Sequence, residues 1–131
     1  MKIKLTVLAF FISMLLTGQV LALTFSTGGL TYRDINATDV KVLGRSSGNT
    51  ATDIVIPDTV GVSGTTYSVT TIGGEDFCEN ELTSVSSPAS VTTIESYAFY
   101  RNELTSVASP DNVTTIEAEA YNDNALTSGI I

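Results

Sequence analysis

Residues 81–102 read ELTSVSSPASVTTIESYAFYRN, and the next 22 residues, 103–124, read ELTSVASPDNVTTIEAEAYNDN. Aligned without gaps, the two stretches are identical at 14 of 22 positions. A third copy begins at Ala125 as ALTSGII, and the stretch from Val69 to Asn80 keeps the same spacing upstream. Self-similarity at one fixed interval predicts a solenoid, in which each unit is a coil that stacks on the next.

Each coil carries apolar residues at fixed positions, which in the clearest copy are Leu82, Val85, Val91, Ile94, Ala98 and Phe99. Because so few side chains cannot bury themselves within one coil, we expect like residues of neighbouring coils to stack into a continuous core. Pro88 and Pro110 lack a backbone donor and should each end a first short strand at a bend. Val91 to Glu95 is then a second extended piece, and residues 96–101 have room for a short helical turn.

One asparagine recurs just before each new strand, as Asn80, Asn102 and Asn124. Its amide both donates and accepts hydrogen bonds, so we expect the stacked amides to satisfy backbone groups of the turns.

The first unit contains an insertion. Pro57 precedes Val69 by 12 positions, whereas Pro88 precedes Val91 by three. The extra residues include two glycines flanked by β-forming residues, which predicts a β-hairpin finger. Upstream, 30–32 and 40–42 alternate apolar and polar residues as half-buried strands do, and 44–52 is typical of a loop. We therefore expect an N-terminal β cap at residues 23–52 and the solenoid at residues 53–131.

Residues 1–22 have the three-part layout of a secretory signal peptide. Lys2 and Lys4 precede an apolar run of twelve residues, and Val20-Leu21-Ala22 suits signal peptidase. The run is well short of the roughly 20 residues that span a bilayer. The expectation is cleavage after Ala22, a secreted or cell-surface location, and no membrane span in the mature chain.

Composition excludes several classes of function. The chain of 131 residues has no His and a single Cys, and after Ala22 four basic residues face 14 acidic ones, a formal charge of −10. Nucleic-acid binding is excluded, because few cations remain to neutralise phosphates. Nucleophile arrangements that need an imidazole base are absent, and Cys78 alone completes neither an intrachain disulfide nor a zinc site. We expect no catalytic residue, no cofactor and no metal site of that kind.

The repeated pattern L-T-S-V-x-x-P-x-x-V-T-T-I-x-x-x-A-F resembles the BspA-type leucine-rich repeat of bacterial and protist surface proteins. The entry into the repeats, Ile54-Val-Ile-Pro57 followed by Val69-Thr-Thr-Ile72, is similar to the usual first unit of that family. The resemblance covers about residues 30–131 and implies an exported, non-enzymatic surface protein; several family members are adhesins that bind host or matrix proteins or other cells. The chain departs from the family at Ser87 and Ser109, where an Ile usually precedes the Pro.

Strand positions that alternate with buried Val and Leu should face one side of the solenoid. These candidate partner-binding residues are Ser84, Ser86, Ser106, Ala108 and Ser128. They form either a shallow binding surface or a merely solvated strand face. Two acidic columns at the repeat spacing, Glu81 with Glu103 and Glu95 with Glu117, are either solvated charges or carboxylates whose repulsion Ca²⁺ would relieve.

The sequence thus predicts a mainly β leucine-rich-repeat solenoid of 22-residue coils, with an N-terminal β cap and short helical turns. Its expected function is binding of a protein or cell-surface ligand, in adhesion, through the strand face. The alternative is a scaffold piece of a longer repeat protein with no binding site of its own. Because 129–131 read Gly-Ile-Ile without a polar capping unit, we expect either that this is the front part of a longer solenoid or that it self-associates through that end. An enzymatic function would need a carboxylate pair such as Glu117 and Glu119 on one face of a strand.

Overall fold

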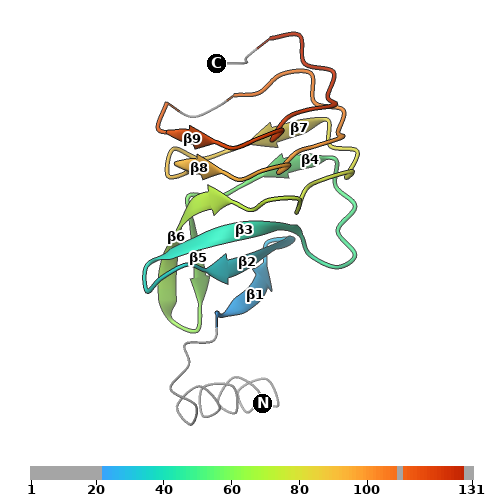
Figure 1. The fold of residues 1–131 in the computed structure, drawn as a ribbon. Coiled ribbons are helices and arrows are strands. Elements are labelled where there is room, and N and C mark those ends of the chain that lie inside the picture. Colours follow the sequence, from blue (N-terminus) through green and yellow to red (C-terminus); the bar gives the residue numbers. More distant parts are fainter. Residues whose placement is uncertain (1–21, 109–110, 129–131) are drawn as a thin grey trace.

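In the computed structural model, which describes residues 22–108 and 111–128, the chain winds upward in stacked coils above a small antiparallel sheet (Figure 1). The described residues form strands and turns and contain no helix. The strands are β1 (Thr24–Thr27), β2 (Leu30–Asp34), β3 (Asp39–Arg45), β4 (Asp53–Val55), β5 (Thr59–Val62), β6 (Thr65–Ile72), β7 (Ser84–Ser86), β8 (Thr93–Ile94) and β9 (Thr115–Ile116).

The first side of each coil is a parallel sheet that joins the coils. The strands follow the order β3-β6-β8-β9, and Ile72, Ile94 and Ile116 align in register across the last three. Ile72 and Ile94 are fully buried, as the repeat predicted. Two threonines precede each of these isoleucines, and Thr114 Oγ1 donates to the carbonyl of Thr92 in the preceding coil. The isoleucine column is therefore buried at Ile72 and Ile94, whereas Ile116 in the last described coil is 41% exposed. The threonine hydroxyls tie the coils together.

The second side is a narrower parallel pairing. β4 pairs with β7, and single bridges continue the ladder between Ser86 and Ala108 and between Ser106 and Ser128. β7 ends two residues before Pro88, which agrees with the predicted bend; Pro110 lies outside the described residues.

The third side consists of turns at residues 76–79, 96–99 and 118–121. At the place predicted for short helical turns, the chain forms these turns instead of a helix. Glu75, Tyr97 and Glu119, one per coil, have φ between 57° and 63°, which is incompatible with a right-handed helix. The turns also pair between coils, since the N–H of Phe99 donates to the carbonyl of Ala120 at 2.8 Å.

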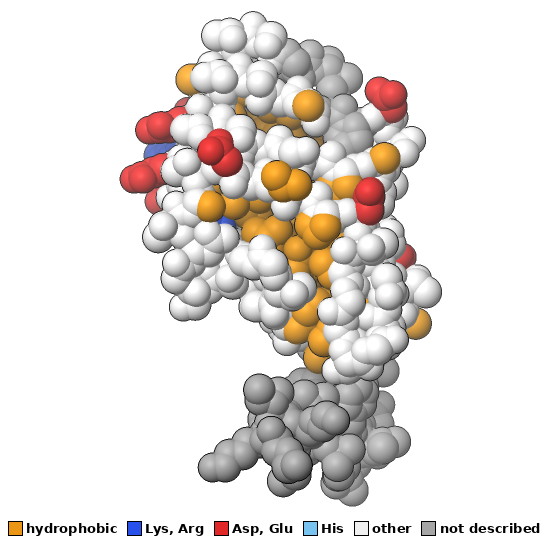
Figure 2. All heavy atoms as spheres, turned by 180° about the vertical axis from the view of Figure 1, so that it is seen from behind, with side chains coloured by type: hydrophobic (Ala, Val, Ile, Leu, Met, Phe, Trp, Pro, Cys, Tyr) orange, Lys and Arg blue, Asp and Glu red, His pale blue; other side chains and the backbone are white. Residues whose placement is uncertain are grey.

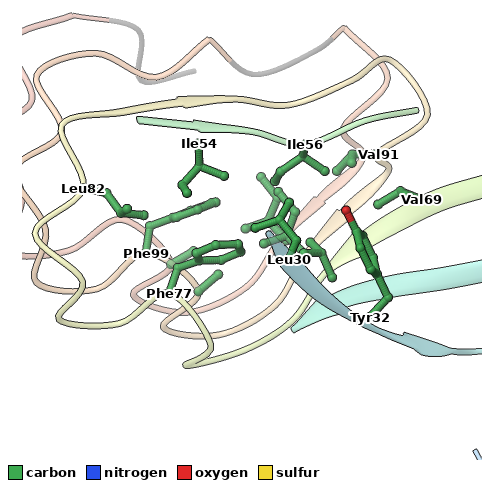
Figure 3. Close-up of a cluster of buried hydrophobic side chains, with 14 of the residues drawn as sticks. Leu30, Tyr32, Ile54, Ile56, Val69, Phe77, Leu82, Val91 and Phe99 are labelled. Carbon is green, nitrogen blue, oxygen red and sulfur yellow. The ribbon is translucent and has the colours of Figure 1, made fainter. Parts of the chain in front are cut away.

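The core consists of ladders of like residues inside the coils (Figure 3). The rings of Phe77 and Phe99 stack with centroids 5.5 Å apart, and Tyr121 continues the stack at 5.2 Å. Leu82 and Leu104 form a second buried column. The predicted stacking of like on like is thus confirmed.

The predicted asparagine ladder is also confirmed. Asn102 is buried, and its Oδ1 accepts from the N–H groups of Asn80 and Leu82 at 3.1 and 2.9 Å. Its Nδ2 donates to the carbonyls of Phe77 and Phe99. With a further bond from Nδ2 to the carbonyl of Tyr100 at 3.3 Å, one side chain satisfies five backbone groups in two coils. A buried polar residue must be satisfied in this way to be tolerated.

The hairpin insertion forms as predicted. β5 and β6 are antiparallel, and Ser63 and Gly64, with φ of 51° and 85°, make the two-residue turn between them. β1, β2 and β3 form an antiparallel sheet, and β3 joins it to the coils by pairing in parallel with β6. The predicted loop begins later than expected, because β3 extends to Arg45. Gly44 lies in the strand, where a Cβ would meet the Asp76 carbonyl oxygen at 2.4 Å.

Two expectations concern residues that the structure does not describe. The signal peptide falls almost wholly within residues 1–21, and the apolar end expected to self-associate is 129–131.

Candidate functional site

The structure brings the five predicted partner-binding residues onto one side of the coils. Ser84 and Ser86 lie on β7, and the bridges align Ser86 with Ala108 and Ser106 with Ser128. All five are exposed, and Val85 between the two β7 serines is partly buried against the core. We call this surface the strand face; it comprises Ser84, Ser86, Ser106, Ala108 and Ser128 together with Asp53 and Val55 of β4.

Sequence reasoning missed Asp53 and Val55. They pair in register with Ser84 and Ser86 and so extend both columns of the strand face by one coil. The hairpin insertion hides them, because it separates Asp53 from Ser84 by 31 residues instead of 22. The matching pattern Asp53-Ile54-Val55 and Ser84-Val85-Ser86, with an apolar β-branched residue at the centre of both, is the signal that would have found them.

Asp53 is the charged group of the strand face. Its Oδ1 accepts hydrogen bonds from Ser84 Oγ at 2.7 Å and from Thr83 Oγ1 at 3.1 Å. The Ser84 bond, followed by the Thr83 bond, holds the pKa of Asp53 below its usual value. The strand face thus offers a fixed carboxylate, several hydroxyls and an exposed apolar side chain, Val55, which is 73% exposed.

The second acidic column joins coils. Glu95 Oε2 accepts from the N–H of Gly74, and Glu117 Oε2 accepts from the N–H and the hydroxyl of Ser96. Lys41 of β3 forms an ion pair with Glu95. Partial burial raises the pKa of Glu95, but the bonds from Lys41 and Gly74 outweigh it and leave the pKa lowered. In the part of the chain that the structure describes, no three acidic or thiol side chains lie close enough together to hold a metal ion.

Comparison with known proteins identifies the repeat. The model of the BspA type leucine rich repeat region (6 copies) matches residues 50–131. The chain belongs to the BspA-type leucine-rich repeat family. Leucine-rich repeats of this kind are protein-interaction modules, so the chain is a repeat protein of the interaction type.

Solved structures show the same fold. A leucine-rich repeat protein from Bacteroides capillosus superposes with a TM-score of 0.62 at 21% identity, over 80% of this chain and 95% of that one. The pneumococcal vaccine antigen PcpA gives 0.63 at 13% identity, over 82% of this chain and 32% of its own. The BspA-type chain therefore spans about a third of the PcpA chain. No curated protein sequence matches it.

The remaining candidate groups of this BspA-type chain, the pair Glu117 and Glu119 and the thiol of Cys78, lie outside the strand face. Glu117 follows β9 directly and Glu119 lies in the turn at 118–121, so the two do not occupy the strand that an enzymatic carboxylate pair would need. Glu119 instead raises the pKa of Tyr97 through its charge. Cys78 is a half-buried free thiol, and burial, followed by the charges of Glu79 and Glu75, raises its pKa, which disfavours the nucleophilic thiolate.

No helix of sufficient length and apolarity to cross a membrane occurs among the described residues.

Proposed function

We propose that this chain is an exported, non-enzymatic module that binds a protein or cell-surface ligand through the strand face and serves in adhesion. The observation that carries the proposal is the alignment of five exposed small side chains at one-coil spacing, with the Asp53 carboxylate fixed at one end. A rigid, shallow surface of this kind supports many weak contacts along an extended partner. Export rests on the signal sequence at residues 1–22.

Absence of an activated nucleophile favours binding over catalysis. On the strand face, the Ser84 hydroxyl donates a hydrogen bond to the Asp53 carboxylate. The chain contains no His, so no imidazole is present to act as a base. A neutral serine without a base is a hydrogen-bonding group and not a nucleophile.

The test is adhesion of beads coated with the chain from Leu23 to Ile131. The surfaces are coated with extracellular-matrix proteins or with bacterial cells. Ser84→Arg, Ser86→Arg and Ser106→Arg together should abolish retention of the beads, because three bulky cations cover the face. A matched variant, Thr65→Arg, Thr66→Arg and Ala118→Arg, adds the same charge at exposed positions elsewhere and should retain it. Equal retention by both variants would reject the strand face.

A scaffold role is the second candidate, and the coil-to-coil hydroxyl bonds favour it. Thr92, Thr114 and Thr127 each donate to a carbonyl of the preceding coil. If most hydroxyls serve stacking in this way, the coils need no ligand of their own. This role would be favoured if beads coated with the unmodified chain bound none of the surfaces and beads coated with either variant did no better.

A further inference from the structure

β4 has one paired edge and one free edge. On the paired side, the N–H of Ile56 donates to the carbonyl of Ser86 at 2.9 Å. Backbone groups of successive strand residues point alternately to the two sides, so Asp53 and Val55 direct theirs away from β7. Among the strands that the structure describes, β4 pairs with β7 alone. Two donors and two acceptors are therefore open to a further strand.

A groove of about 360 Å³, lined by both polar and apolar groups, lies beside Val55 of this free edge. Figure 2 shows hydrophobic side chains gathered in a band down the middle of this side of the molecule. The groove has β4 and the start of β5 on one side and the turn between β1 and β2 on the other. Its lining includes Thr27, Gly28, Tyr32, Val55, Pro57 and Val60. Since Tyr32 and Val60 are themselves buried, the groove reaches the core between the antiparallel sheet and the first coil.

The ends of the free edge are acidic. Asp53 and Asp58 are both exposed, one at the start of β4 and the other just after Pro57. The ion pairs within the described residues use Lys41 and Arg101 with other carboxylates and leave these two without a cation. The edge therefore has hydrogen-bonding groups in the middle and a carboxylate near each end, of which Asp53 also accepts hydrogen bonds from Ser84 and Thr83 on the β7 side.

We propose that this edge and groove bind an extended peptide segment with alternating apolar and cationic residues, which adds to β4 as a further strand. Side chains of an added strand alternate between its two faces. Those on the inner face enter the groove above Tyr32 and Val60, which selects apolar residues. Those on the outer face lie beside Asp53 and Asp58, which selects lysine or arginine. The main chain of the peptide pairs with Asp53 and Val55.

This site shares Asp53 and Val55 with the strand face, but the peptide docks on the opposite edge of β4 from the hydroxyls of β7 and the later coils. If no peptide binds at this edge, the proposed adhesive function still stands. If the strand face proves not to bind a partner, the peptide site on the free edge still stands.

The probes are five fluorescein-labelled heptapeptides, acetyl-Lys-X-Lys-X-Lys-X-Lys-amide, with X as Val, Ile, Leu, Phe or Tyr. At least one should bind the Leu23–Ile131 chain saturably, with a Kd below about 1 mM by fluorescence anisotropy. The same peptide with alternate amides N-methylated keeps its charge and side chains but loses donors, so it should bind at least about tenfold more weakly.

A protein variant makes the matching test from the other side. Val55→Pro removes one donor from the free edge and leaves the N–H groups of Ile54 and Ile56 for β7; proline is tolerated on strand edges. It should weaken binding at least about tenfold, whereas Val55→Thr, which keeps the N–H, should remain within about threefold. Circular dichroism spectra that match the spectrum of the unmodified chain would show that both variants fold.

The proposal is overturned if none of the five peptides binds, or if N-methylation leaves the affinity unchanged. The second outcome would mean that the acidic surface attracts cationic peptides without strand pairing. Because it uses the unmodified protein, the N-methyl comparison decides the matter even if Val55→Pro fails to fold.

Discussion

Asp76 is the residue at which the first coil departs most from the pattern of the others. The same position is Ala98 and Ala120 in the next coils, both buried. Asp76 is half-buried against Gly73, where a Cβ would meet its Oδ2. Burial raises the pKa of Asp76 to about 6; Lys41 and then Arg33 oppose that shift, and Glu95 and Glu75 add to it.

The pKa of Asp76 has a consequence for stability. A carboxyl whose folded pKa is raised binds its proton more tightly when folded, so it stabilises the fold fully below the ordinary value of 3.8. That contribution is lost as pH rises through about 6. Asp76→Asn should therefore match the unmodified chain near pH 4 and exceed it near pH 7, on the order of 1 kcal/mol after allowance for solvent screening.

Urea denaturation at several pH values measures this difference. Carboxylates that do not interact with Asp76 titrate alike in both proteins and cancel in the comparison. A difference in the free energy of unfolding that stays constant from pH 4 to pH 7 would contradict the assignment.

At the scale of the element, the stacked aromatic column holds the three described turns together. Phe99 lies between Phe77 and Tyr121 and is fully buried. Phe99→Ala removes both ring contacts and leaves a cavity, which should cost about 3–5 kcal/mol of unfolding free energy. Phe99→Leu keeps part of the volume and should cost clearly less. Urea denaturation with an unchanged m-value is the measurement, and equal losses for the two variants would argue against ring stacking.

The elements also show how far the sequence could be read. The 22-residue interval predicted the ladders of Ile, Leu, Phe and Asn, because stacking makes equivalent positions neighbours. Paired glycines among β formers predicted the hairpin. The third side was expected to have room for a short helical turn, but the repeat cannot reveal left-handed φ at non-glycine residues such as Tyr97 and Glu119.

The candidate site was predicted in part for a related reason. The serines of the strand face follow the repeat, so their common exposure could be predicted from spacing. Asp53 and Val55 could not be found by spacing, since the hairpin shifts their register. The free edge of β4 depends on how the antiparallel sheet meets the first coil, and that contact has no repeat to indicate it.

At the scale of the whole molecule, the start of the described chain bears on export. The N–H of Leu23 donates to Asp34 Oδ1 at 2.5 Å. Cleavage after Ala22 would convert this amide into an α-ammonium group beside a carboxylate, which strengthens the hydrogen bond. Protein recovered from culture medium or the cell surface should therefore begin at Leu23 by N-terminal sequencing.

The same contact gives a stability test. Asp34→Asn should lower the melting temperature of the chain that begins at Leu23 more than that of a chain with the first 22 residues attached, because only the former has the ammonium group. Equal effects in the two chains would show that the contact does not depend on processing.

The central claim is that the strand face meets the partner. The most direct measurement is photo-crosslinking from benzoylphenylalanine placed at Ser86, with the same group at Thr66 as the control, on the surfaces used for bead adhesion. We predict a covalent adduct from position 86 and none from position 66. Equal adducts from both positions, or an adduct from position 66 alone, would contradict binding through the strand face.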